Sequence, residues 1–366
     1  DAAARRPPPS SRRRRARAVV SHVAINGRFL TQRTTGVQRF AAEVTAALDR
    51  MAAAGTCPAP RLLVPPGADA SAFPHLAVER FGRLHGQAWE QAELPRRAGS
   101  SVLVSLGNTA PLLAGGRQAV VIHDAGVFDT PGSYSKAFRA WYRALHRALP
   151  RCGARLLTVS EFSRGRIAYT LRLDPGRIGV LPEGAEHILR EPADTAILAR
   201  HGLAPGRFAL AVGTRAPHKG LGGLPGAAAL LAREGMRLAV AGAADPGVFR
   251  NATDPSGEAV VALGRVTDAE LRALYEAALC LVFPSRYEGF GLPPLEAMAC
   301  GCPVLAAAAG AVPEVCGDAA LWFDAAGGHP RPAEALERLL REPGLAQDLR
   351  RRGLARAAGF SWHAAA

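Results

Sequence analysis

The chain has 366 residues, 48% of them apolar, which favours a globular protein of two domains over a disordered or fibrous one. No apolar run approaches the roughly 20 residues that a helix needs to cross a bilayer. The formal net charge of +14 is unevenly spread, because residues 1–18 hold seven arginines and one aspartate.

This basic amino-terminal segment, residues 1–18, predicts a disordered tail, because it is rich in arginine and proline and has no apolar stretch. For the same reason it is not a secretory signal. Its charge fits loose attraction to an anionic membrane surface. Start-site noise in an arginine-biased chain explains it equally well. Nucleic-acid binding is disfavoured, because no aromatic residues alternate with the arginines to stack on bases.

Short apolar runs alternate with alanine-rich amphipathic stretches along the rest of the chain, and this alternation predicts parallel sheets covered by helices. A first helix is expected over residues 37–48, directly after Gly36. Two such sheets predict two Rossmann-like domains joined between residues 182 and 207. The expected strands, in chain order, are Val102–Leu106, Val120–Ile122, Leu156–Val159, Ala209–Val212, Leu238–Ala241 and Leu279–Phe283.

Polar residues follow two of these predicted strands. His123 and Asp124 come after one strand, and Arg215, His218 and Lys219 come after another. Open α/β sheets bind ligands at the carboxyl ends of their strands, so both groups are candidate site residues. Of 45 basic residues only two are lysines. A lysine retained in so arginine-rich a chain predicts a task for a compact ammonium, such as binding a phosphate.

The stretch RYEGFGLPPLEAMACGCPV, residues 286–304, carries the clearest functional signal. Seven residues separate Glu288 from Glu296, and Gly289 and Gly291 flank a phenylalanine between them. An apolar run precedes the stretch and another ends it, so the pattern predicts strand, glycine loop, helix and strand. Loop amides and the positive end of the helix would face one point. With Glu288 in the loop and Glu296 in the first helical turn, the site suits an anion with several hydroxyls, such as a sugar nucleotide.

This stretch resembles the donor-site motif of the retaining, family four glycosyltransferases of GT-B fold. The resemblance continues in LGRVTDAELRALYEAALCLVFPS and GAVPEVCGDAALWFDAA. The segments INGRFLTQRTTGVQRF, WEQAELP, VVIHDAGVFDTP and LLTVSEFSRGRI resemble the acceptor-side domain of the bacterial mannosyltransferase-like branch. Together these segments reach from about residue 25 to residue 362.

The resemblance implies an α/β protein in which two Rossmann-like domains face each other across a cleft with their parallel sheets. After the tail of residues 1–18, an acceptor-side domain is expected over residues 19–190. A donor-nucleotide domain follows over residues 191–345. Residues 346–366 are expected to form a helical segment that returns toward the first domain and is cut short.

The resemblance also implies roles for the residues of the first domain. His123 would reach the donor sugar and bond to one of its hydroxyls. Asp124 would either contact the substrate or cap the turn that follows it. The backbone amide of Gly36 would approach the distal phosphate.

In the second domain, Glu288 would bind sugar hydroxyls and Glu296 the ribose hydroxyls. The backbone of Arg265 and Val266 would border the nucleobase. Arg215 and Lys219 would bind the diphosphate, with more weight on these two because His218 stands where related sequences have arginine. Near the hinge between the domains, Glu183 is a second departure, because asparagine is common at its position. The loop amides expected to hold the sugar and the diphosphate belong to Gly289, Phe290, Gly291 and Leu292.

The expected function is retaining transfer of a hexose, with mannose favoured, from a nucleotide-diphosphate sugar such as GDP-mannose to a glycan or lipid-linked acceptor. No cofactor is expected. No metal is expected either, because the chain has no Asp-x-Asp pair and its six cysteines show no metal-ligand spacing. The protein is expected in the cytoplasm, with peripheral contact at the inner face of the membrane. The alternatives are a sugar-nucleotide epimerase or glycogen-type phosphorylase on the same fold, or a non-catalytic nucleotide-sugar binder.

Overall fold

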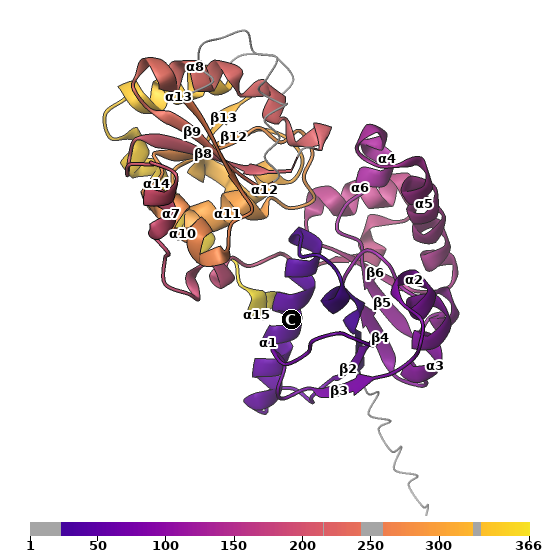
Figure 1. The fold of residues 1–366 in the computed structure, drawn as a ribbon. Helices are drawn as coiled ribbons and strands as arrows, with labels where there is room; N and C mark the ends of the chain where they lie inside the picture. Colours follow the sequence, from indigo (N-terminus) through magenta and orange to yellow (C-terminus); the bar gives the residue numbers. More distant parts are fainter. Residues whose placement is uncertain (1–22, 215, 243–258, 325–330) are drawn as a thin grey trace, which may run out of the picture.

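The computed structural model describes residues 23–214, 216–242, 259–324 and 331–366. The predicted tail, residues 1–18, lies outside them. Two α/β domains lie side by side, the first indigo to magenta and the second red to yellow (Figure 1). Each is built on a single sheet whose strands all run parallel, as the sequence predicts.

The first sheet has the strand order β3-β2-β1-β4-β5-β6-β7. β1 lies at its centre, between β2 and β4, with Ile25 opposite Leu62 on one side and Val104 on the other. Helices cover both faces, so most strand residues are buried, as in other parallel sheets. The strands are β1 (Val23–Asn26), β2 (Arg61–Val64), β3 (Ala77–Arg80), β4 (Val102–Ser105), β5 (Gln118–Val121), β6 (Arg155–Thr158) and β7 (Ile178–Val180).

The second sheet has the strand order β10-β9-β8-β11-β12-β13. All four residues of β11 and of β12 are buried, which explains why these strands are continuous apolar runs without alternation. The strands are β8 (Phe208–Gly213), β9 (Arg237–Gly242), β10 (Val260–Gly264), β11 (Cys280–Phe283), β12 (Val304–Ala307) and β13 (Ala320–Phe323). The six strands expected from the apolar runs are all found, within two residues at each end.

The helices pack one apolar face against these sheets. In α1 that face carries Phe40, Val44 and Ala47 at helical spacing. The helices of the first domain are α1 (Gly36–Ala53), α2 (Gly86–Ala88), α3 (Leu94–Ala98), α4 (Gly126–Asp129), α5 (Lys136–Arg151) and α6 (Glu161–Leu171). The rest are α7 (Ala196–Arg200), α8 (Pro225–Arg233), α10 (Asp268–Ala277), α11 (Leu292–Ala299), α12 (Val312–Cys316), α13 (Pro332–Arg341), α14 (Leu345–Ala357) and α15 (Trp362–Ala365).

The two domains share a continuous hydrophobic core. α15 leaves the second domain and lies against α1, where the chain ends (Figure 1). Trp362 of α15 is buried in a cluster that also holds Phe40 of the first domain and Leu281 of the second. β7 and β8 are joined by residues 181–207, and the domain limits at residues 190 and 345 stay a prediction. Across the described ranges, no helix has the length and apolarity to cross a membrane.

Candidate active site

The predicted strand-loop-helix unit is present, with β11 ending at Phe283 and α11 beginning at Leu292. Gly291 caps the helix with a φ of 112°, a left-handed conformation that favours glycine. Two prolines lie in the first turn, where a missing N–H leaves no bond unmade. The prediction that Glu296 lies in this first turn is wrong. The helix starts at Leu292 and the prolines fill its second and third positions, so Glu296 is its fifth residue.

The amides of the glycine loop are unpaired within the described structure. No described residue accepts a hydrogen bond from the N–H of Gly289, Phe290, Gly291 or Leu292. These groups gather at the amino end of α11, where the helix dipole adds partial positive charge. The loop therefore has free donors for an anionic ligand.

Glu288 and Lys219 form an ion pair beside this loop. The Nζ of Lys219 lies 2.8 Å and 3.0 Å from the two carboxylate oxygens of Glu288. Lys219 belongs to a short turn, Pro217–Lys219, that follows β8. The carbonyl of His218 in that turn accepts a hydrogen bond from the N–H of Arg286, which ties the turn to the donor loop. The side chains of Lys219 and Glu288 keep 22% and 12% exposure, so both charges still reach solvent.

Two more basic residues were predicted after β8, His218 and Arg215. His218 pairs through Nδ1 with the hydroxyl of Ser133 in the first domain, at 2.9 Å. Burial and the neighbouring ammonium of Lys219 lower the pKa of His218, so the ring is neutral at pH 7. Arg215 lies outside the described residues, so its contact with the diphosphate stays a prediction.

The donor loop sits directly on the first domain. The carbonyl of Gly289 accepts hydrogen bonds from the hydroxyls of Ser160 and Ser163, at 2.6 Å and 2.9 Å. A Cβ added to Gly289 would lie 2.6 Å from the carbonyl oxygen of His123, so any side chain here would push the two domains apart. The two serines gave no signal in the sequence, because their partner is a backbone group 126 and 129 residues away.

Tyr287 makes a second contact across the domains. Its hydroxyl donates to Asp129 of α4 at 3.0 Å and accepts from the N–H of Ala125 at 3.2 Å. Burial and the carboxylates of Asp124 and Asp129 raise the pKa of Tyr287, so the phenol keeps its proton. Sequence reasoning missed Tyr287, although its place directly before Glu288 was a usable signal.

Asp124 bonds within its own turn. Its Oδ1 accepts a hydrogen bond from the N–H of Gly126 at 2.6 Å, which is the capping contact considered for it. Burial raises the pKa of Asp124, and the carboxylate of Glu288 raises it further, while the N–H of Gly126 and the ring of His123 lower it. A contact between Asp124 and substrate stays a prediction.

His123 follows shortly after β5, its carbonyl oxygen lies close to Gly289 of the second domain, and the residue is 4% exposed. Its Nε2 lies 2.9 Å from the carbonyl oxygen of Leu106, which can only accept, so Nε2 carries a proton. Its Nδ1 lies 3.8 Å from a carboxylate oxygen of Glu183. Burial raises the pKa of Glu183, partly offset by His123. Both ring nitrogens thus face protein groups, and a bond from His123 to a sugar hydroxyl stays a prediction.

Glu296 is 6% exposed and bonded through both oxygens. Its Oε1 lies 2.8 Å from Nε2 of His187, and its Oε2 accepts from the hydroxyl of Tyr275 at 3.1 Å. A carboxylate has about four lone-pair positions, so further donors can still bind it. Sequence reasoning anticipated neither partner of Glu296.

The remaining predicted residues occupy loops or helix ends. Gly36 is exposed at the first position of α1, and a Cβ added there would meet nothing within 4 Å. Arg265 and Val266 lie between β10 and the amino end of α10. Their predicted contacts with phosphate and base stay predictions. In the part of the chain that the structure describes, no three His, Cys, Asp or Glu side chains are grouped as metal ligands.

The chain is similar in sequence to known glycosyl transferases. The family model of the glycosyl transferases group 1 matches residues 196–356. The chain is 35% identical over 261 residues to O-antigen chain mannosyltransferase B of Escherichia coli, covering 67% of each protein. It is 36% identical over 230 residues to D-inositol 3-phosphate glycosyltransferase of Frankia alni, covering 58% of this chain and 56% of that protein.

Solved structures share the fold over nearly the whole chain. The glycosyltransferase WaaG, involved in lipopolysaccharide biosynthesis, has a TM-score of 0.67 at 18% identity, covering 93% of this chain and 96% of WaaG. HepE of Anabaena, in complex with UDP and glucose, has a TM-score of 0.69 at 17% identity, with the same coverage. The sequence comparison shows that the chain belongs to the group 1 glycosyl transferases, in their mannosyltransferase-like branch, and the structural comparison shows the GT-B fold.

Proposed function

We propose that this glycosyltransferase is metal-independent and retains anomeric configuration. It would transfer a hexose, with mannose favoured, from a nucleotide-diphosphate sugar such as GDP-mannose to a glycan or lipid-linked acceptor. The observation that carries the proposal is the Lys219–Glu288 pair beside the unpaired amides at the amino end of α11. Cations and amides suit a diphosphate, and a partly exposed carboxylate suits the hydroxyls of a sugar.

Each group then has one task. The ammonium of Lys219 and the loop amides stabilise the charge that develops on the diphosphate as the glycosidic bond breaks. Glu288, oriented by Lys219, accepts hydrogen bonds from the sugar hydroxyls. Glu296 accepts from the hydroxyls of the ribose.

Retention follows from attack on the face from which the diphosphate leaves. The acceptor oxygen bonds to the anomeric carbon as the bond from that carbon to the phosphate oxygen breaks. The acceptor's proton passes to the departing phosphate, so no side chain has to act as nucleophile. Tyr287, which directly precedes Glu288, keeps its proton because burial raises its pKa, and so it acts as a donor to Asp129.

The preference for mannose and for a polysaccharide acceptor is supported by the relatives. Two of them are named mannosyltransferases of Escherichia coli, O-antigen chain mannosyltransferase B and the serotype-specific WbdA. This chain covers two thirds of the first and 12% of the second. The identity of the donor nucleotide is therefore best determined by measuring binding, and not by analogy with these relatives.

Nucleotide binding should stabilise the folded protein. GDP is expected to raise the melting temperature in proportion to the logarithm of its concentration above the dissociation constant. UDP, ADP and TDP are titrated in parallel to identify which nucleotide the protein binds. At one hundred times the dissociation constant the gain is about 2.7 kcal/mol. A thermal-shift titration measures this. If none of the four nucleotides shifted the melting temperature, the donor site would be wrongly assigned.

Transfer should persist when divalent metal is removed. Lys219 and the amides at α11 supply the positive charge at the diphosphate, so excess EDTA is expected to leave the rate within about twofold. The measurement is radiolabelled mannose transfer with and without EDTA. Complete loss of activity, restored by magnesium or manganese, would mean that a metal ion stabilises the leaving group instead.

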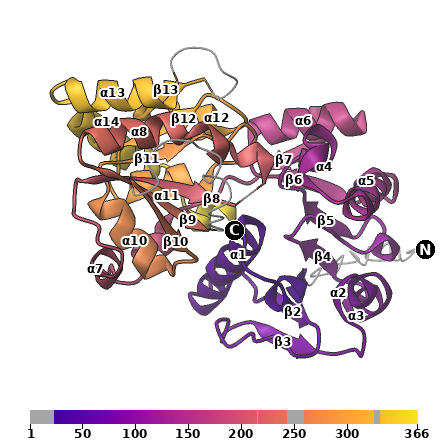
Figure 2. The same cartoon turned by 45° about the horizontal axis from the view of Figure 1, so that its top comes forward.

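We also propose peripheral contact with an anionic membrane, which the sequence placed in the amino-terminal tail outside the described residues. Within the described structure, α5 suits this contact. Its 16 residues include five basic and no acidic side chains, and Phe138 and Trp141 are each 39% exposed. Aromatic and basic residues on one helix are typical of interfacial helices. α5 lies on the side of the first domain away from the second (Figure 2).

Binding to vesicles tests this surface. More protein should sediment with phosphatidylglycerol vesicles than with phosphatidylcholine vesicles. Salt at 0.5 M should release the bound protein, because it screens the charges. Trp141→Ala should weaken binding because it removes the largest exposed ring of α5. Tyr169→Ala, which removes a 76% exposed ring from α6, is the matched control and should bind as the unmodified protein does. Equal loss in both variants would remove α5 from the proposal.

A further inference from the structure

The linker between the two sheets, residues 181–207, is in direct contact with the carboxyl end of the chain. The backbone N–H of Trp362 donates to both carboxylate oxygens of Glu186, at 3.0 Å and 3.2 Å. A Cβ added to Gly184 would lie 2.4 Å from the nitrogen of Trp362 and 2.8 Å from the carbonyl carbon of Ser361. The segment that ends the second domain therefore lies directly on the linker, in a space that only glycine leaves open.

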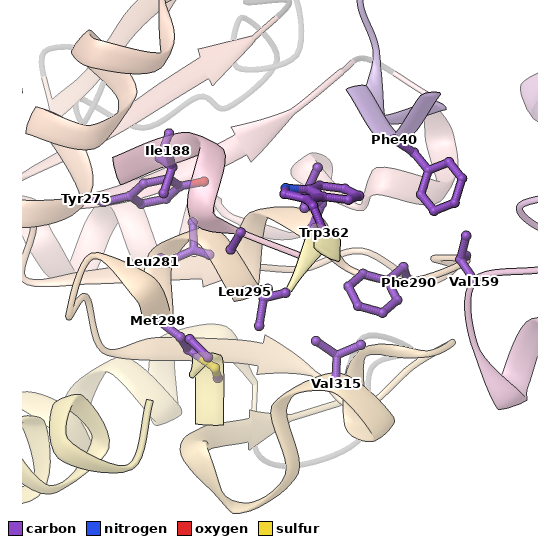
Figure 3. Close-up of a cluster of buried hydrophobic side chains, with 14 of the residues drawn as sticks. Phe40, Val159, Ile188, Tyr275, Leu281, Phe290, Leu295, Met298, Val315 and Trp362 are labelled. Carbon is purple, nitrogen blue, oxygen red and sulfur yellow. The ribbon is translucent and has the colours of Figure 1, made fainter. Parts of the chain in front are cut away.

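Trp362 also joins the two domains through its ring. It is 1% exposed, and its ring packs edge-to-face on Phe40 of α1 with centroids 5.9 Å apart. Phe40 in turn packs edge-to-face on His123, at 4.8 Å. Figure 3 shows Trp362 between Phe40 on one side and Tyr275 on the other. The indole thus lies between a helix of the first domain and the residues around Glu296.

A chain of buried hydrogen bonds runs from this indole to the donor-site carboxylate. The Nε1 of Trp362 lies 3.2 Å from Nδ1 of His187, and Nε2 of His187 lies 2.8 Å from Oε1 of Glu296. An indole N–H can only donate, so Nδ1 of His187 must accept. The proton of the His187 ring is therefore on Nε2, from which it donates to Glu296. His187 is 2% exposed, so water cannot readily replace either bond.

We propose that His187 and Trp362 are positioning residues of the donor site. Trp362 selects the tautomer of His187 that donates to Glu296, and this bond, with that from Tyr275, fixes the orientation of the carboxylate. The lone pairs that remain on Glu296 are then directed at the ribose hydroxyls before the nucleotide arrives. The inference rests on the proposed role of Glu296 in binding ribose.

The opposite tautomer shows why the indole matters. With the proton on Nδ1, the ring would present a lone pair to the carboxylate of Glu296 at 2.8 Å, and two acceptors would face each other in a buried site. The carboxylate of Glu296 would have to turn away from the ring. Because Trp362 rests on α1, the donor carboxylate keeps its geometry only while the carboxyl end of the chain stays docked on the first domain.

The tautomer can be read directly. In protein labelled with ¹⁵N-histidine and without nucleotide, the two ring nitrogens of His187 are expected to show the protonated-Nε2 pattern. Trp362→Phe keeps a ring in the cluster and removes the N–H, so a mixture of tautomers should appear. Trp322→Phe, the same change in β13, should leave the His187 spectrum unchanged. A protonated Nδ1 in the unmodified protein would overturn the inference.

Nucleotide affinity gives the functional readout, with GDP, UDP, ADP and TDP as the probes. His187→Leu removes a bond to a charged group, so affinity should fall about tenfold. Trp362→Phe should also weaken affinity, and Trp322→Phe should not. His187→Gln keeps one N–H and one carbonyl, so binding should return to within about twofold. This rescue separates a hydrogen-bonding role from a space-filling one.

The outcomes distinguish the inference from the proposed function. If Glu296→Ala weakens nucleotide binding while His187→Leu does not, the inference fails and the ribose contact stands. If the unmodified protein binds none of the four nucleotides, the proposed function fails, and the spectrum of His187 still decides whether Trp362 selects the tautomer. If Trp362→Phe does not fold, the contrast between His187→Leu and His187→Gln decides.

Discussion

Replacing Lys219 by methionine should reduce sugar transfer by about 10²- to 10³-fold, the effect of removing one group that stabilises developing charge. Methionine keeps the length of the side chain but removes the ammonium that lies 2.8 Å from Glu288. The diphosphate then loses a cation, and Glu288 loses the partner that orients it. Steady-state transfer with a mannosyl donor gives kcat/KM for this comparison.

Two variants make this expectation specific to the site. Lys136→Met changes the other lysine of the chain, which is exposed at the start of α5, and should leave the rate unchanged. Lys219→Arg keeps the charge on a larger, planar group, so partial activity is expected. If Lys219→Met and Lys136→Met had equal rates, Lys219 would have no part in stabilising the leaving group.

Glu90→Ala should lower the free energy of unfolding by about 3–5 kcal/mol, because it breaks a buried ion pair and leaves its partner uncompensated. Glu90 is 1% exposed and Arg28 is 6% exposed, and Nε of Arg28 lies 3.1 Å from the Glu90 carboxylate. Asn26 also donates to Glu90, at 2.7 Å, and would lose that acceptor. Urea unfolding followed by tryptophan fluorescence measures the loss, since the neighbouring Trp89 is wholly buried.

An exposed ion pair supplies the comparison for Glu90. Arg338 and Glu342 of the second domain lie 2.7 Å apart, with side chains 52% and 47% exposed. Glu342→Ala should lower the free energy of unfolding far less than Glu90→Ala does, because solvent screens exposed pairs. A cost for Glu90→Ala no larger than this would show that Arg28 finds other compensation, such as its bond to Thr109.

The strands that could be predicted are those whose apolar runs are long enough to stand out. β8 and β11 each carry four or more consecutive apolar residues, because helices cover both faces of a parallel sheet. β1, β2, β3, β7, β10 and β13 were not predicted. Among them, β1 ends in Asn26, β3 is mostly exposed and ends in two adjacent charged residues, and β7 is three residues with a central glycine. Their place is decided by pairing with neighbouring strands, which the local sequence does not encode.

The candidate site divides in the same way. Glu288, the glycine loop and the start of α11 lie within nine residues, and their local spacing predicted the loop and the helix. Other contacts of the site join residues far apart in the sequence. Tyr275 and His187 contact Glu296 from 21 and 109 residues away, and Glu183 contacts the buried ring of His123. A single sequence has no signal for such contacts. Glu183 stands where asparagine is common, and the structure places its carboxylate beside His123.

The hydrogen bonds of Glu314 offer a way to measure how often the two domains separate. This residue of α12 accepts hydrogen bonds from the amides of Glu161 and Phe162, the first two residues of α6 in the other domain, at 2.8 Å and 2.9 Å. Such amides have no partner inside their own helix. Whenever the domains separate, these two N–H groups face water and can trade their hydrogens for deuterium. Their exchange rate therefore counts openings of the enzyme, and a bound nucleotide that holds the domains together would slow it without touching either residue.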